Sequence, residues 1–137
     1  MTPKYYVDTA IWRDLHENRN DSSKNLGQLA FEFFKMVSVK KYRGIYSEFI
    51  VEELSHAYDK QTIVNLFRDL SELLEKAEIN AHQIKEALSL CSHLNIPLGD
   101  ALHGILARDS NAIMVTRDRH FRKLNAMVTI KKPEDLI

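Results

Sequence analysis

Residues 5–12 read Y-Y-V-D-T-A-I-W, and the way this stretch ends indicates the fold class. Its first half is rich in aromatic and β-branched residues, which predicts a short strand, and the strand stops at a single acid, Asp8. Because an unpaired carboxylate is costly to bury, its place there needs a reason. Two interpretations are open. Asp8 and Thr9 either cap the helix that follows, or they put a carboxylate at the end of a strand, where open α/β sheets bind ligands.

Short apolar runs alternate with helical patterns along the rest of the chain. Strands are predicted at residues 4–7, 44–46, 112–115 and around 127–130. Apolar residues at helical spacing predict helices at residues 9–16, 26–37, 48–57 (capped by Ser47), 63–74, 84–94 and 98–109, with short helices from Arg119 and at residues 133–136. Strands separated by helices imply parallel strands. We therefore expect an α/β fold, a three-layer sandwich with a central parallel sheet of four to five short strands and flanking helices, in a single domain over residues 1–137.

Composition narrows the class of protein. Nineteen basic and nineteen acidic residues give a net charge of zero, so binding to nucleic acid would have to come from a local patch. Cys91 is the single cysteine, which excludes an intrachain disulfide. The sequence has no apolar run near the roughly 18 residues of a membrane span and no apolar leader at its start. We expect a cytoplasmic protein without membrane contact.

Four acids follow strand or helix signals: Asp8, Glu53, Asp100 and Asp118. The carboxyl ends of parallel strands lie at one edge of a sheet, and helices at that edge can bring further acids to it. Carboxylates gathered there repel one another unless a cation is bound, and oxygen ligands suit Mg²⁺ or Mn²⁺. Each acid also has a structural explanation, because acids stabilise helix N-termini and Glu53, like its neighbour Glu52, suits a solvated helix face.

The motifs V-D-T at residues 7–9, E-L at 53–54, D-A-L at 100–102 and T-R-D at 116–118 together resemble the PIN domain family. Their order and spacing, 45 residues from Asp8 to Glu53, 47 more to Asp100 and 18 more to Asp118, carry the resemblance. The family comprises small metal-dependent ribonucleases and includes VapC-type toxins of toxin–antitoxin pairs.

The resemblance assigns the metal-binding and catalytic roles to the four acids. It favours Glu53 over Glu52, because an inward-facing apolar residue, Leu54, follows it. Thr9 and Thr116 match supporting hydroxyls. The chain departs from the family at two positions: Gly104 stands where members often have alanine, and His120 stands where some members carry a further acid.

The resemblance further implies an endoribonuclease that hydrolyses RNA phosphodiester bonds with one or two Mg²⁺ or Mn²⁺ ions. The expected product ends are a 5′-phosphate and a 3′-hydroxyl. An antitoxin that blocks the acidic site and a homodimer are the expected protein partners.

Basic residues surround the fourth acid. Because cations near a helix N-terminus oppose its dipole, their clustering suggests contacts to RNA phosphates. The candidates are Arg117, Arg119, Arg122 and Lys123, with Arg13 as a weaker one. A solvated surface that balances nearby acids is the alternative.

Two other functions compete with the nuclease. A module of the same fold could bind RNA or protein without cutting, although all four acids are present. A phosphotransfer enzyme or receiver would need D-x-D after the first strand, or paired acids there and a late lysine after a strand, and neither pattern appears.

Overall fold

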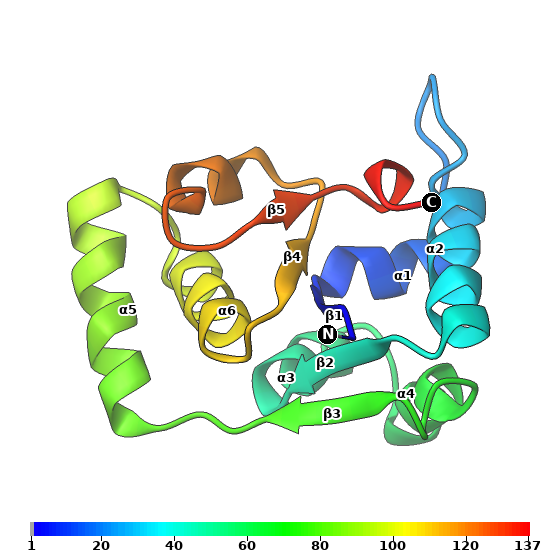
Figure 1. Ribbon diagram of the computed structural model, residues 1–137, viewed down its shortest axis with the longest axis horizontal. Helices are drawn as coiled ribbons and strands as arrows, with labels where there is room; N and C mark the ends of the chain where they lie inside the picture. Colours follow the sequence, from blue (N-terminus) through cyan, green and yellow to red (C-terminus); the bar gives the residue numbers. More distant parts are fainter. Residues whose placement is uncertain (1) are drawn as a thin grey trace.

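The computed structural model describes residues 2–137, and its centre is a five-stranded parallel sheet (Figure 1). The strand order is β3-β2-β1-β4-β5. The strands are β1 (Lys4–Val7), β2 (Arg43–Ser47), β3 (Leu74–Ala77), β4 (Ile113–Val115) and β5 (Ile130–Lys131). The predicted α/β class and parallel sheet are confirmed.

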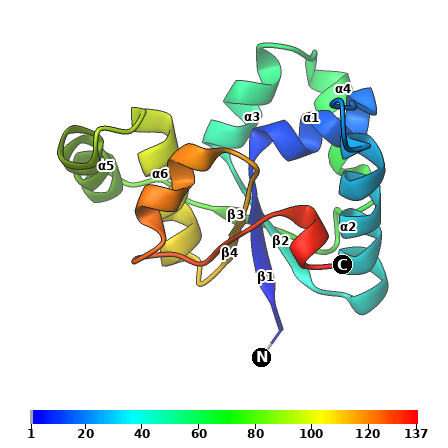
Figure 2. The same ribbon diagram turned by 90° about the horizontal axis from the view of Figure 1, so that it is seen from above.

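Helices cover both faces of this sheet. They are α1 (Thr9–Glu17), α2 (Leu26–Lys40), α3 (Glu48–Ser55), α4 (Lys60–Arg68), α5 (Ala81–Leu94) and α6 (Leu98–Asp109), with 3₁₀-helices η1 (Arg119–Leu124) and η2 (Pro133–Asp135). After β1, the chain adds β2 and then β3 on one side of β1. It then crosses back and adds β4 and β5 on the other side. Because parallel crossovers are right-handed, the two directions place their helices on opposite faces. Figure 2 shows α5 and α6 on one side of the strands and α2 on the other, which gives the expected three layers.

The winding direction reverses between β1 and β4, and this is where the site forms. The two strands pair in parallel, with Val7 opposite Val115. The amide of Asp8 continues the ladder by donating to the carbonyl of Val115 at 3.0 Å. In open α/β sheets, ligands bind beyond the carboxyl ends of the strands at such a point.

The prediction of a helix over residues 63–74 is correct in its first half and wrong in its second half. Helix α4 ends at Arg68, and Leu74 begins β3, which pairs with β2 from Gly44 to Ser47. Leu73 and Leu74 continue the helical spacing of the apolar residues before them, so periodicity alone assigns them to the helix. Pairing with β2 overrides this local signal. The last strand, β5, also begins later than predicted.

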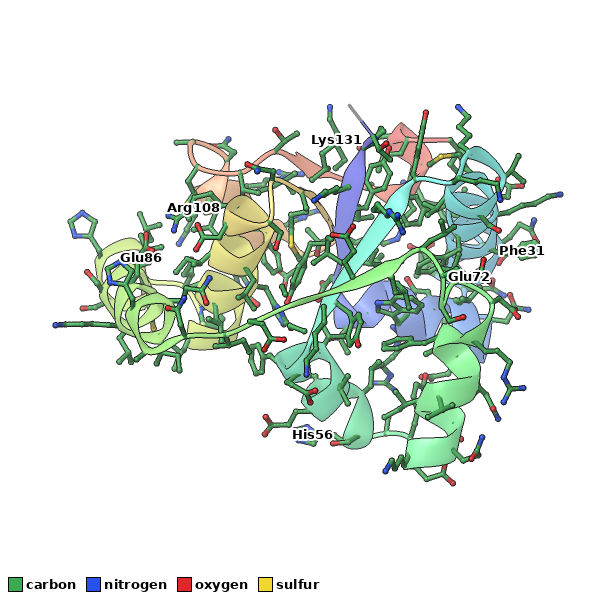
Figure 3. The ribbon with its side chains drawn as sticks, turned by 60° about the horizontal axis from the view of Figure 1, so that its bottom comes forward. Phe31, His56, Glu72, Glu86, Arg108 and Lys131 are labelled. Carbon is green, nitrogen blue, oxygen red and sulfur yellow. The ribbon has the colours of Figure 1, made fainter. Side chains whose placement is uncertain are left out.

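Local capping and one ion pair hold the helices in place. Ser47 caps α3 as predicted, since its Oγ accepts a hydrogen bond from the Ile50 amide at 3.3 Å. Arg108 of α6 and Glu86 of α5, both labelled in Figure 3, form two hydrogen bonds of 2.6 and 2.8 Å. Across residues 2–137, no helix is long and apolar enough to span a bilayer.

Candidate metal centre

The carboxylate of Asp8 faces β4 rather than the helix it precedes. Asp8 occupies the N-cap position of α1, but its side chain makes no capping hydrogen bond. Instead, Oδ2 accepts a hydrogen bond from Thr116 Oγ1 at 2.8 Å, and that hydroxyl accepts one from the Asp118 amide at 3.0 Å. The acid after β1 is thereby tied to the turn after β4, and the capping interpretation of Asp8 is not supported.

Glu53 enters the site from α3. Its Oε1 accepts hydrogen bonds from Thr9 Oγ1 and His103 Nε2, both at 2.6 Å. Within residues 2–137, its second oxygen, Oε2, accepts no hydrogen bond. The neighbouring Glu52 is exposed. The structure thus turns Glu53, and not Glu52, toward the other acids.

A buried chain of hydrogen bonds supports Glu53 from behind. His103 is 2% exposed, and its Nδ1 lies 2.8 Å from the Tyr6 hydroxyl, which in turn lies 2.8 Å from Ser47 Oγ. Burial raises the pKa of Tyr6, so the phenol keeps its proton. The sequence signal for His103 is its place one helical turn after Asp100. Tyr6 was missed because a tyrosine in a buried strand resembles an ordinary core residue.

Asp100, Asp118 and His120 form the other half of the site. Each offers one potential ligand atom, and these atoms all lie within 4.8 Å of one another. His120 Nδ1 lies 3.1 Å from Asp118 Oδ1 and 3.4 Å from Asp100 Oδ2. Asp118 also caps η1, because its Oδ1 accepts the His120 amide at 2.9 Å. Asp118 therefore caps η1 and also lies in the cluster of potential ligands.

Burial and mutual repulsion set the charge of the acids. Burial, followed by the charges of Asp118 and Asp8, raises the pKa of Asp100 to about 6. Burial also raises the pKa of Asp8, against the opposing charge of His103. Burial alone would raise the pKa of Glu53, but the hydrogen bond and charge of His103 lower it overall. A bound cation would stabilise the ionised form of Asp8 and Asp100.

The side chains fit a hard divalent cation. Asp100 Oδ2 is buried, and across the described chain, residues 2–137, it accepts no hydrogen bond. An orphaned buried oxygen costs free energy unless a partner is supplied. A set of carboxylate oxygens is what Mg²⁺ and Mn²⁺ bind. Of the four expected acids, Asp100 and Asp118 thus lie within ligand distance of each other. Asp8 interacts with Glu53, Asp118 and Asp100 through their charges.

Three of the five predicted RNA-binding residues already have partners in the protein. Arg117 forms an ion pair with Glu134, with an Nη2–Oε1 distance of 2.8 Å. Arg13 donates to a glutamate one turn further along α1 at 2.8 Å. Lys123 Nζ donates to a backbone carbonyl at the end of α5 at 3.3 Å.

Arg119 and Arg122 line a surface pocket beside Asp118. Lys131, labelled in Figure 3, and Lys132 also line this pocket. Both lysines were missed in the sequence, because only the pairing of β5 with β4 brings them next to η1. We call the four side chains of Arg119, Arg122, Lys131 and Lys132 the basic pocket.

A parallel sheet with carboxylates gathered beyond the carboxyl ends of β1 and β4 defines an α/β protein with an acidic site at one edge of its sheet. The sequence pattern of the PIN domain matches residues 5–127. The chain belongs to the PIN domain family, as its motifs predicted. No curated protein matches the sequence significantly.

Solved structures of similar fold include chains from toxin–antitoxin complexes. VapBC2 from Rickettsia felis bound to a DNA fragment from its promoter has a TM-score of 0.67 and 18% identity, over 94% of this chain and 98% of that one. VapBC-1 from nontypeable Haemophilus influenzae has a TM-score of 0.66 and 16% identity, over 96% and 98%. A toxin–antitoxin complex from Klebsiella pneumoniae has a TM-score of 0.65 and 15% identity, over 94% and 97%. These likenesses establish the shared fold.

Proposed function

We propose that this chain is a metal-dependent endoribonuclease that hydrolyses RNA phosphodiester bonds, and that it is the toxin of a toxin–antitoxin pair. The observation that carries the proposal is the buried, unbonded Oδ2 of Asp100, which lies beside Asp118 and has a raised pKa. Membership of the PIN domain family supports nuclease chemistry, and the toxin–antitoxin complexes of similar fold support the biological setting.

We assign different roles to the acids at the site and to the residues that orient them. Asp8, Asp100 and Asp118 would hold the ion, and Glu53 would complete the ligand set through Oε2, which accepts no hydrogen bond within residues 2–137. Thr9 and His103 fix the orientation of Glu53 through Oε1, and Thr116 fixes Asp8. When bound, Mg²⁺ or Mn²⁺ lowers the pKa of a water that attacks the scissile phosphate and offsets the charge on the phosphoryl oxygens.

RNA approaches this site over the basic pocket. Arg119 and Arg122 contact phosphates directly, and Lys131 and Lys132 extend the contact along β5. Arg117, Arg13 and Lys123 contribute less, because each would first have to leave an internal partner. A local patch of this kind reconciles RNA binding with zero net charge.

Cleavage of total cellular RNA by the purified protein, with Mn²⁺ or with a chelator, tests the proposal. We expect cleavage that needs the metal and falls at least about 100-fold in Asp8→Asn and in Asp100→Asn. Asp59→Asn is the matched control, because it makes the same change at an exposed cap of α4. Cleavage that survives both site substitutions would remove the nuclease assignment.

An antitoxin that blocks the acidic site would also cover the apolar groove between α2 and α4. Phe31 and Val39 line it and are 46% and 71% exposed. Co-purification with the product of a neighbouring small open reading frame tests this partner. We expect Phe31→Asp to abolish the complex, while Val64→Asp, at an exposed apolar residue of α4 that does not line this groove, leaves it intact. A complex that survives Phe31→Asp would place the antitoxin elsewhere.

We place a homodimer contact on α5. Ile84 and Leu88 lie one turn apart on this helix and are 46% and 54% exposed. Leu88→Asp should lower the mass measured by analytical ultracentrifugation from that of a dimer to that of a monomer. A wild-type protein that sediments as a monomer at micromolar concentration would contradict the dimer.

A non-cleaving RNA-binding module is the second candidate, and the basic pocket is the observation that favours it. In that case RNA would bind through Arg119 and Arg122 and remain uncut with either metal. Binding measured by filter retention, together with intact RNA on a denaturing gel, would identify this function.

A further inference from the structure

His120 lies next to the carboxylates of Asp100 and Asp118 at the acidic site. It stands in η1, two residues after Asp118, and is about half exposed. The turn that Asp118 makes with the His120 amide brings both side chains to the same side of η1. The imidazole is therefore next to the carboxylates of Asp118 and Asp100 and open to solvent.

The distances match those between ligands of one ion. Ligands at right angles around an ion that they bind at about 2.1 Å are about 3.0 Å apart. His120 Nδ1 lies 3.1 Å from Asp118 Oδ1 and 3.4 Å from Asp100 Oδ2. The second of these oxygens is the buried one that, within residues 2–137, accepts no hydrogen bond. An ion placed between the three atoms would give that oxygen a partner.

We propose that His120 supplies a nitrogen ligand to the divalent ion held by Asp100 and Asp118, so that this site prefers Mn²⁺ and other first-row transition ions to Mg²⁺. The proposal rests on the proposed function only in taking this site to bind a divalent ion. Imidazole nitrogen favours transition metals, whereas Mg²⁺ strongly prefers oxygen ligands. The nitrogen ligand therefore decides between the two ions that an all-carboxylate site leaves open.

A simpler role for His120 predicts the opposite effect of its removal on the metal affinity of the site. If the imidazole only neutralises Asp100 and Asp118 as an ion-pair partner, it competes with the metal for their oxygens. Removing it would then strengthen metal binding. If it is a ligand, removing it weakens metal binding, and weakens Mn²⁺ more than Mg²⁺.

The test measures binding of Mn²⁺ and of Mg²⁺ alone, in the absence of RNA, to the wild-type protein, His120→Ala and His120→Asp. We expect His120→Ala to lower Mn²⁺ affinity about tenfold and Mg²⁺ affinity less. His120→Asp should retain Mg²⁺ binding and lose the preference for Mn²⁺. Pulsed electron paramagnetic resonance of bound Mn²⁺ should show coupling to a nitrogen nucleus in the wild-type protein and none in either variant.

His82→Ala is the matched control. His82 is an exposed histidine in the first turn of α5, beside Asp109 at the end of α6 opposite to Asp100. This variant should bind both ions like the wild-type protein. Circular dichroism verifies that all three variants are folded.

Three results would overturn the inference. They are unchanged or tighter Mn²⁺ binding in His120→Ala, no nitrogen coupling in the wild-type protein, and no Mn²⁺ binding at millimolar concentration. The proposed function fails separately. Nitrogen-coupled Mn²⁺ without RNA cleavage would refute the nuclease and keep the ligand, whereas metal-dependent cleavage with unaltered binding in His120→Ala would do the reverse.

Discussion

At the scale of single residues, the acidic site lowers the stability of the metal-free fold at neutral pH. Asp100 is held in a half-buried position next to two other acids, and its pKa rises to about 6 from an ordinary 3.8. The folded protein therefore binds this proton more tightly than the unfolded chain does. The resulting stabilisation is complete below about pH 4 and is lost as the pH rises through about 6. At neutral pH, the metal-free site opposes folding.

Asp100→Asn should stabilise the metal-free protein at pH 7 by about 1–2 kcal/mol, since asparagine cannot ionise. This gain in the free energy of unfolding is smaller than the full pKa shift would give, because the carboxylate is partly exposed to solvent. Urea unfolding with a chelator at pH 4.5, 5.5 and 7 measures the effect, and the gain should shrink toward the lowest pH. A variant that is less stable than the wild-type protein at pH 7 would show that the carboxylate of Asp100 stabilises the fold more than its repulsion from the other acids destabilises it.

Tyr6→Phe tests the buried chain behind Glu53. The change removes the hydroxyl that joins Ser47 to His103 and leaves their polar atoms without that partner. We expect the free energy of unfolding to fall by about 1–3 kcal/mol in urea denaturation. Tyr5→Phe is the control, because its hydroxyl makes no hydrogen bond within residues 2–137, and its effect should stay within about 0.5 kcal/mol. Equal effects of the two changes would contradict the role of this chain.

At the scale of elements, the approach of α6 to η1 sets the distance between Asp100 and Asp118. Gly104 makes this approach possible, since a Cβ at this position would lie 2.5 Å from Leu124 Cδ1. Leu124 is 1% exposed and has little room to move. This contact explains why the chain has glycine where the resemblance led us to expect alanine.

Gly104→Ala should therefore destabilise the protein, although alanine favours helix by about 1 kcal/mol. Overpacking costs about 1–3 kcal/mol, so we expect a net loss of roughly 1 kcal/mol in urea unfolding. The double variant Gly104→Ala/Leu124→Ala supplies the check, because the truncated side chain makes room for the new methyl group. Leu124→Ala should cost less in the alanine background than in the wild-type one. Additive effects would mean that the two residues do not compete for space.

At the scale of the whole molecule, the reversal of winding between β1 and β4 gathers the site from four separate segments of the chain. Residues after β1 and β4, on α3 and at the start of α6 all converge there. An ion bound by these segments would link the helices on the two faces of the sheet. Metal binding should therefore stabilise the whole fold rather than one loop.

Mn²⁺ at about 100 times its dissociation constant should add about 2.7 kcal/mol to the free energy of unfolding and raise the melting temperature by several degrees. Differential scanning calorimetry with and without the ion measures this shift. Asp100→Asn should melt at nearly the same temperature in both conditions. A similar rise in this variant would mean that Mn²⁺ binds away from the proposed site.

Local patterns in the sequence were sufficient to predict most of the helices and strands. The strand that ends at Asp8, the capping of α3 by Ser47 and the apolar spacing of α2, α5 and α6 depend on residues within a few positions of one another. Such patterns act through backbone preference and short-range periodicity, which a sequence displays directly. The PIN domain motifs then identified the family, and they predicted Asp8, Glu53, Asp100 and Asp118 as the site acids.

The tertiary structure alone decided the features that depend on distant partners. Leu74 lies in a strand because β2 pairs with it, although its local spacing is helical. Tyr6 meets His103 across 97 positions of sequence, and Thr116 meets Asp8 across 108, so no local pattern reveals these bonds. Lys131 reaches the basic pocket through the β4–β5 pairing, and His120 reaches Asp100 through the packing of η1 on α6. The sequence by itself determined the family and the acids predicted to carry the chemistry, and long-range packing decided which atoms they meet.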